Sequence, residues 1–147
     1  MKRKKLRSLS AIRRQLDKEF SRYVRLRHAD HVGNVACVTC NKSLHWSDTH
    51  CGHYVPRQYL SVRWDDRNAN VQCPYCNTYR HGNLAEYTLF MQKTYGQSVV
   101  DELLQAKHKT VKFTRSQLEE MLLKYQALTA TWGILGTWGT PEGIRHD

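Results

Sequence analysis

The chain has 147 residues, 40% of them hydrophobic, and a formal net charge of +10 at pH 7. This length is enough for one domain with a modest core. No run approaches the ~18 consecutive apolar residues that a membrane-spanning helix needs, and the charged N-terminus lacks the apolar segment of a signal peptide. We therefore expect neither a membrane protein nor an exported one. The five cysteines, an odd number in such a chain, favour thiols and metal binding over disulfides.

Basic residues concentrate in the first thirty positions, which hold eleven Lys or Arg against three Asp or Glu. Such a block suits a nucleic-acid backbone, because each neutralised phosphate releases counterions; the alternative is a solvated arm that only aids solubility. Residues 1–8 predict a basic arm. Residues 10–27 predict a helix, because apolar residues recur there every three or four positions. The candidate DNA-contacting residues are Lys2, Arg3, Lys4, Lys5, Arg7, Arg13 and Arg14.

The middle of the chain predicts turns and short strands around two cysteine pairs. A turn over residues 31–34 leads into a strand over residues 35–40, and residues 54–55 and 60–63 are further candidate strands. The second cysteine pair should open a short helix from Asn77 that breaks before the next helix.

Three helices are predicted after that break. Asn83 is the expected N-cap of the first, and Gly96 ends it. Ser98 opens the second, and the spacing of Thr114 and Gln117 is that of a capping box for the third. The Gly- and Trp-rich end shows no periodicity. The expected segments are a basic arm and helix, a zinc-containing core, C-terminal helices and a tail, over residues 1–30, 31–95, 96–131 and 132–147.

The two cysteine pairs follow the spacing C-x2-C-x32-C-x2-C, with ligands at Cys37, Cys40, Cys73 and Cys76. Four thiolates from two tight turns satisfy a tetrahedral Zn2+. Because protein then fills every coordination position, this zinc is structural, and the chemistry must lie elsewhere. Without metal, so loop-rich a segment has too little core to hold its shape. The alternative is two unrelated pairs of buried cysteines; for the odd Cys51 we favour inert packing.

Gly52-His53 lies between the pairs, Asn68 stands five residues before Cys73, and Asn77 directly follows Cys76. This pattern resembles the HNH, or His-Me finger (ββα-metal), endonucleases, with Asn in place of the last His. C-x2-C…C-x2-C-N also resembles the endonuclease VII type of Holliday-junction resolvase. The larger pattern is most similar to the phage NinG/Rap recombination nucleases; its elements are residues 21–27, 37–41, 52–57, 68–77, Gly82-Asn83 and Tyr87.

This resemblance implies an α+β fold with a small zinc-stapled ββα-metal core and flanking helices. It also agrees with the chemistry of the residues. A neutral imidazole at His53 can take a proton from water, and the amide oxygen of Asn77 can hold a Mg2+ or Mn2+ ion that keeps several waters. Many HNH enzymes have an acidic residue or His where this chain has Gly52, which favours a single-Asn site. His81, four residues after Asn77, is a further candidate ligand, or else a surface histidine.

Two more residues complete the candidate site. Arg57 could clamp the scissile phosphate with its fork of donors, or else form a salt bridge with Asp65 or Asp66. The resemblance implies that Asn68 fixes the loop that orients the base and does no chemistry. For His53 the alternative is a core histidine satisfied by backbone.

We therefore predict a metal-dependent DNA endonuclease. By resemblance alone, it cuts branched DNA such as Holliday junctions and D-loops during phage recombination, in the cytoplasm of the bacterial host. Two cuts at a four-way junction would favour a homodimer. The alternatives are an HNH enzyme that nicks duplex DNA, and a zinc-knuckle module that binds DNA without catalysis.

Overall fold

The computed structural model describes residues 5–135, and for residues 132–135 the backbone alone. Three residues of the predicted DNA-contacting arm, Lys2, Arg3 and Lys4, lie outside the described residues, as does most of the predicted tail. The fold is a small mixed α and β domain with two antiparallel two-stranded sheets. Within residues 5–135, no helix has both the length and the apolar character to cross a membrane.

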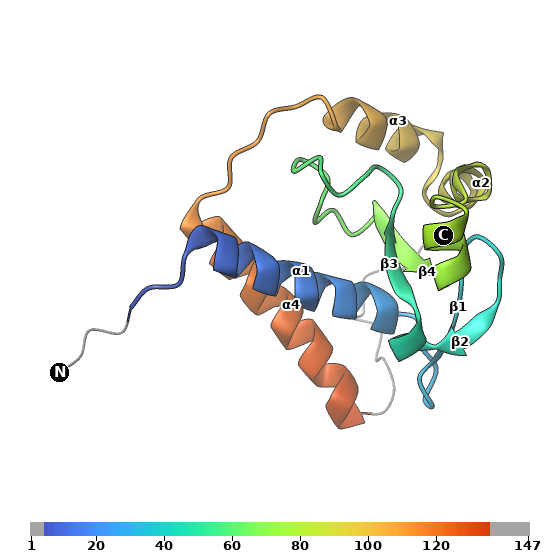
Figure 1. Cartoon of the computed structure of the whole chain (residues 1–147), viewed down its shortest axis with the longest axis horizontal. Helices are drawn as coiled ribbons and strands as arrows, with labels where there is room; N and C mark the ends of the chain where they lie inside the picture. The colour runs from blue at the N-terminus through green and yellow to red at the C-terminus, as the bar shows by residue number, and fades with distance from the viewer. Residues whose placement is uncertain (1–4, 136–147) are drawn as a thin grey trace.

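Helices α1 (Leu9–Leu26) and α4 (Arg115–Leu135) pack side by side (Figure 1). The Ser8 hydroxyl accepts a hydrogen bond from the Ala11 amide and begins α1, so the predicted helix over residues 10–27 is confirmed. One face of α1 is apolar at spacings of three and four and meets α4 in the larger core. The buried residues of this larger core are Ile12, Leu16, Phe20, Tyr23, Val24, Trp64, Ala69, Leu118, Leu122 and Tyr125.

The capping box predicted for α4 is confirmed. The Gln117 amide donates to the Thr114 hydroxyl, and the Thr114 amide donates to Gln117 Oε1. These reciprocal bonds satisfy backbone donors that the first turn of a helix leaves without partners. The helix then continues to Leu135, into the segment from residue 132 that we expected to lack periodicity.

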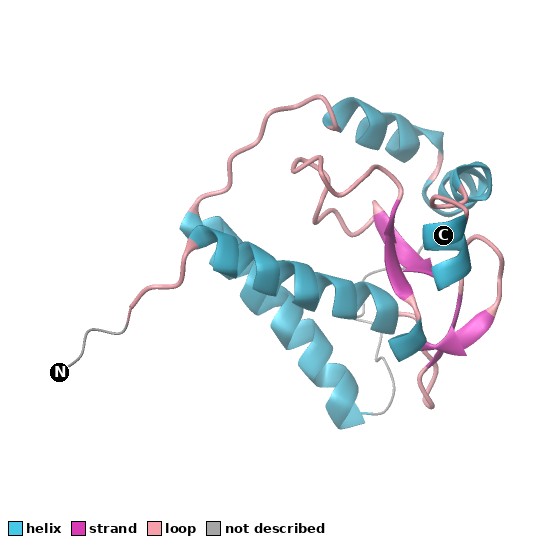
Figure 2. Ribbon diagram, viewed as in Figure 1, coloured by secondary structure: helices cyan, strands magenta, loops and turns pink. Residues whose placement is uncertain are grey.

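The two sheets are β1–β2 and β3–β4. β1 (Asn34–Ala36) pairs with β2 (Ser43–His45), and the short helix η1 (Trp46–Asp48) leads into β3. β3 (His50–His53) pairs with β4 (Ala69–Gln72), with His50 opposite Gln72 and His53 opposite Ala69. Figure 2 shows this second sheet between the pair α1 and α4 on one side and the helical segments of residues 75–95 on the other.

Several strand predictions are wrong. The strand expected over residues 35–40 ends at Ala36, because the chain turns at Cys37, whose carbonyl accepts from the Asn41 amide. Residues 54–55 and 60–63 form turns rather than strands. Val55 and Val62 are apolar because they are buried in a second core, and the side chain of Asn68 supplies the backbone partners that a neighbouring strand would have supplied.

The second cysteine pair runs into a π-helical turn, η2 (Tyr75–Tyr79), so the short helix begins before Asn77 rather than at it. Helices α2 (Leu84–Tyr95) and α3 (Gln97–Ala106) then pack on each other around the second core. Asn83 is not an N-cap of the expected kind. Its backbone is left-handed, with φ of 46°, and its side chain makes no capping bond.

Candidate functional site

The four predicted ligand cysteines lie together, and their sulfur atoms are all within 4.8 Å of one another. Cys40 and Cys73 have a sulfur–sulfur distance of 3.7 Å. Tetrahedral coordination at the usual Zn–S bond length requires a separation of about 3.8 Å, so the cluster has the dimensions of a zinc site. All five cysteines are free thiols. The four cysteines could therefore hold a metal such as zinc.

Hydrogen-bond donors surround these sulfur atoms. The Cys76 amide donates to Cys73 at 3.4 Å, and the Asn83 side-chain amide donates to Cys76 at 3.6 Å. The Thr39 hydroxyl lies 3.3 Å from the Cys37 sulfur and accepts a bond from Gln72, which leaves its proton for the sulfur. Burial by itself raises the pKa of the Cys37 thiol, but the bonds from Thr39 and nearby backbone amides outweigh it and bring that pKa to about 6. The surroundings of Cys37 thus favour the thiolate form that binds metal, whereas burial raises the pKa of Cys40 to about 12 and also raises that of Cys73.

A cleft of about 350 Å³ lies beside this cluster, between α1 and β3. It brings together three of the predicted catalytic residues, His53, Asn77 and Arg57. The other lining residues are Asp17, Phe20, Ser21, Arg25, Thr49, His50 and Cys51. Among the described residues of the cleft, Asp17 is the only one with a carboxylate.

His53 ends β3 and is partly buried against Phe20, with ring centroids 6.2 Å apart. Its Nε2 lies 2.9 Å from the carbonyl oxygen of Arg63. A carbonyl can only accept, so Nε2 carries the proton and Nδ1 has the free lone pair. Burial lowers the pKa of this imidazole below its ordinary value of 6.5. His53 is therefore neutral at neutral pH, with one nitrogen able to accept a proton.

Asn77 projects from η2 toward the first residue of β3, where its side-chain amide lies 3.0 Å from His50 Nδ1. His50 was not among the residues predicted for the site. It lies three positions before His53 in β3, and residues at that spacing are expected to point to opposite faces of a strand, but both line the cleft. Gly52 has no room for the ligand found in many HNH enzymes: a Cβ there would collide with the side-chain amide of Gln72. His50 instead supplies the second metal-binding type of side chain beside Asn77.

Asp17 is the second residue of the cleft that the sequence did not reveal. It accepts from Arg57 at 3.0 Å, from Arg63 Nε at 2.9 Å and from Trp64 Nε1 at 2.9 Å. The alternative partner that we considered for Arg57, Asp65 or Asp66, is wrong, since its carboxylate partner is Asp17. The Arg57 side chain nonetheless keeps 61% exposure, so part of its donor fork faces solvent at the cleft.

Asn68 lies behind the cleft rather than in it, with no exposed surface. Its side chain accepts from the Val55 amide and donates to the carbonyls of Val55 and Val62, and so holds both ends of the loop that precedes Arg63. His81 is not brought to the cleft; it lies in an exposed turn with φ of 51°.

The predicted DNA-contacting residues within the described part of the chain differ in exposure. Lys5 and Arg7 are exposed ahead of α1, and Arg14 is exposed on that helix. Arg13 is only partly exposed, and its Nε is buried without a hydrogen-bond partner.

Comparison with known proteins places the chain in a family. The family model described as Bacteriophage Lambda NinG protein matches residues 1–132. The chain belongs to this NinG family. The protein ninG of Salmonella phage P22 is 28% identical over 116 residues, which make up 77% of this chain and 53% of that protein. The protein ninG of Escherichia phage lambda is 27% identical, over 77% of this chain and 53% of the relative.

The chain thus spans about half the length of the NinG relatives that it matches. No solved structure shows significant similarity to it. The predicted resemblance to the NinG group is confirmed, whereas the wider resemblance to HNH and endonuclease VII-type enzymes stays a prediction.

Proposed function

We propose that the protein is a metal-dependent endonuclease that hydrolyses phosphodiester bonds of branched DNA, with a ββα-metal (His-Me finger) site. The observation that carries the proposal is the cleft shared by His53, His50 and Asn77. The order β3, β4, η2 supplies the two strands and the helical turn of such a site. The branched substrate and the setting in phage recombination rest on the resemblance to the NinG/Rap nucleases.

His53 acts as the general base in this proposal. The Arg63 carbonyl holds Nε2–H, so Nδ1 is the atom that accepts the proton of the attacking water. Burial keeps the ring neutral before the reaction. Once protonated, the imidazolium still donates Nε2–H to the same carbonyl, so the ring does not need to turn during the proton transfer.

Asn77 and His50 would hold a divalent cation. Their side-chain nitrogen atoms lie 3.0 Å apart. Rotation of the Asn77 amide by about 180° would exchange its nitrogen and oxygen and bring the oxygen beside His50 Nδ1. When bound, the cation supplies positive charge to a phosphate oxygen and to the leaving 3′-oxygen. An amide oxygen with an imidazole nitrogen fits Mn2+ better than Mg2+, which prefers oxygen donors alone.

Asp17, which lines the cleft, positions two arginines. It orients Arg57, whose remaining donors face solvent, and Arg63, whose carbonyl holds His53. Two guanidinium groups on one carboxylate leave a net positive charge beside the base. That charge favours a phosphodiester over a neutral substrate.

Metal-dependent cleavage of a panel of DNAs tests the proposal. The panel contains a four-way junction, a D-loop and a linear duplex of matched sequence, each with Mn2+, with Mg2+ and with neither. We expect the wild-type protein to cut the branched DNAs faster than the duplex. His53→Ala should lower cleavage by about 10²- to 10⁴-fold with little loss of binding, whereas the control His81→Ala, on an exposed turn, should cut normally.

Three results would contradict parts of this proposal. Equal rates on junction and duplex would contradict the preference for branched DNA and indicate a general nicking enzyme instead. Absence of metal-dependent cleavage, with DNA binding intact in wild type and His53→Ala alike, would leave a zinc-knuckle binding module. Parallel loss of binding and cleavage in His53→Ala would make His53 a structural residue. Sedimentation of the protein with a four-way junction tests the expected homodimer.

A further inference from the structure

The cleft holds a cation, Arg25, that none of the steps above uses. Arg57 and Arg63 are both paired with Asp17, but Arg25 has no carboxylate within salt-bridge distance among residues 5–131. Its Nε donates to the Ser21 carbonyl at 3.2 Å, and its Nη1 makes a long contact of 3.5 Å with the Trp46 carbonyl. These two bonds leave most of the five guanidinium donors without a protein acceptor.

The guanidinium of Arg25 lies over the indole ring of Trp46. The Arg25 Cζ lies 5.2 Å from the centre of the indole ring, and the Arg22 Cζ lies 5.9 Å from the same ring. A cation–π contact uses none of the N–H donors of a guanidinium, and these donors form the planar fork that matches two phosphate oxygens. Burial lowers the pKa of Arg25, but a guanidinium remains charged at neutral pH. A positive charge that is partly buried without a counter-ion gains most from an anionic ligand.

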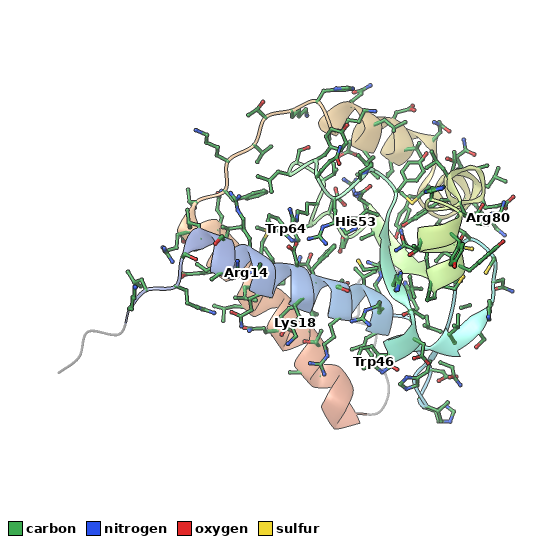
Figure 3. The ribbon with its side chains drawn as sticks, in the orientation of Figure 1. Arg14, Lys18, Trp46, His53, Trp64 and Arg80 are labelled. Atoms are coloured by element: carbon green, nitrogen blue, oxygen red, sulfur yellow. The ribbon has the colours of Figure 1, made fainter. Side chains whose placement is uncertain are left out.

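Arg25 also ends a basic row along α1. Arg14, Lys18 and Arg25 follow at intervals of four and seven residues, which places them on one face of a helix. This is the face away from α4, because the buried residues Leu16 and Tyr23 lie on the opposite side. Figure 3 shows Arg14 and Lys18 along α1 and His53 beside the same helix. From Arg14 to Arg25 the row is about 16 Å long, a distance that spans about five phosphates of one strand when measured along the axis of duplex DNA.

The acidic residues of α1 do not neutralise this row. Asp17 is bound by Arg57, Arg63 and Trp64. Glu19 points toward α4, where the Thr129 hydroxyl lies 3.4 Å from its carboxylate. The face that borders the cleft is therefore basic from the exposed middle of α1 to the partly buried Arg25.

We infer that Arg25 binds a backbone phosphate of DNA inside the cleft, and that Arg14 and Lys18 lead the same strand to it along α1. The inference rests on the proposed function in that DNA is the ligand. Of the DNA contacts that the sequence predicted on α1, the inference keeps Arg14 but not Arg13, whose Nε the structure buries. It adds Lys18 and Arg25, which the sequence did not single out.

Salt-dependent binding tests this inference without any cleavage. Fluorescence anisotropy of a labelled linear duplex is measured without divalent ions, between about 50 and 200 mM salt. Arg25→Gln should weaken binding by about 10-fold and reduce the log–log salt slope by about 0.9, the value for one lost phosphate contact. Lys18→Gln should reduce the slope by the same amount. Lys93→Gln, which removes one exposed positive charge from α2, should change neither quantity.

Two additions protect the test from a variant that does not fold. Arg25→Met keeps an unbranched side chain that can pack on Trp46, and far-UV circular dichroism checks each variant. On the unaltered protein, modification of arginine by phenylglyoxal, read by mass spectrometry, should be slower at Arg25 when DNA is bound. Equal modification with and without DNA, or an Arg25 variant that binds like Lys93→Gln, overturns the inference.

These outcomes are separate from those of the proposed function. A protein that binds DNA through Arg25 but never cuts it would remove the nuclease proposal and keep this inference. A protein that cuts DNA normally with Gln at position 25, and binds it with an unchanged salt slope, would remove this inference alone.

Discussion

Asn68→Ala offers a direct test of how the fold holds the candidate base. The wild-type side chain is fully buried and makes three hydrogen bonds to the backbone, to the amide and carbonyl of Val55 and to the carbonyl of Val62. Its removal leaves the buried amide and carbonyl of Val55 without partners, and it takes one of two partners from the Val62 carbonyl, which still accepts from the Asp65 amide. Each unsatisfied group costs about 1–3 kcal/mol, and carbonyls less than amides. We expect the free energy of unfolding to fall by about 3–5 kcal/mol, a large part of the total for one domain.

The assay is equilibrium unfolding in guanidinium chloride, with the metal site kept loaded. With a denaturant dependence of about 4 kcal/mol per molar, the midpoint should fall by about 1 M. The matched control is Asn34→Ala, an exposed position on β1, which should change the free energy of unfolding by less than about 0.5 kcal/mol. A loss below about 1 kcal/mol in Asn68→Ala would refute the reasoning, because it would mean that water or other groups replace all three bonds.

The same variant should affect the cleft. Residues 54–62 lead directly to Arg63, whose carbonyl holds His53 and whose guanidinium binds Asp17. If the nuclease proposal is right, Asn68→Ala should therefore cut DNA more slowly even at temperatures where it remains folded. Unchanged cleavage by the folded variant would show that residues 54–62 are not needed to orient the candidate base His53.

Four further predictions concern the metal cluster and the cleft. Cys73→Ser should lose bound zinc and unfold at lower temperature while the control Cys51→Ser keeps one zinc per chain, as measured by elemental analysis; equal zinc in both would refute a four-cysteine site. Because burial lowers the pKa of His53, cleavage should rise with pH to a plateau, with its midpoint below 6.5. The free energy of unfolding should decrease as the pH drops below 6.5, because the unfolded chain takes up a proton that the buried ring does not. A midpoint of cleavage above 6.5 contradicts this. Mn2+ should support faster cleavage than Mg2+, and His50→Ala should reduce that difference. Gly52→Ala should destabilise the fold by about 1–3 kcal/mol, and Gln72→Ala should relieve part of that loss in the double variant.

The sequence was sufficient for the elements that depend on local chemistry. The apolar period of α1 and the reciprocal bonds of Thr114 and Gln117 act within a few residues, so pattern and propensity determine them. The cysteine spacing similarly predicted the cluster, because four thiolates in two tight turns have few other uses. These features need no knowledge of the rest of the fold.

The sheet β3–β4, which carries the candidate base His53, could not be predicted in this way. β4 is Ala-Asn-Val-Gln, and all four residues are buried, so it shows neither the alternation of a half-exposed strand nor the apolar run of a buried one. Its polar side chains are tolerated because distant residues supply hydrogen-bond partners to most of their polar atoms; the exception is Gln72 Oε1, which is buried without a partner. Asn70 donates to the Tyr87 hydroxyl, and Gln72 donates to the Thr39 hydroxyl and to the Gly82 carbonyl.

The unpredicted members of the cleft have the same origin. Asp17 lies on a helix where an acidic residue is expected to face solvent, and only the folded chain brings Arg63 and Trp64 to it. Arg25 was one of many basic residues near the N-terminus, and only the folded chain places it in the cleft and beneath Trp46. Such residues gain their roles from contacts between segments far apart in the chain, which no local pattern contains.

Gln72 joins the metal cluster to the cleft. Its side chain lies against Gly52, the residue before the candidate base, and donates to the Thr39 hydroxyl, which in turn contacts the sulfur of Cys37. Gln72 is fully buried. The packing around it therefore leaves little free space to absorb a movement of either the cysteine cluster or β3. Loss of metal should therefore displace β3 as well as the two cysteine turns. If the nuclease proposal is right, the cluster should affect cleavage through the position of His53, although none of its four thiolates lines the cleft.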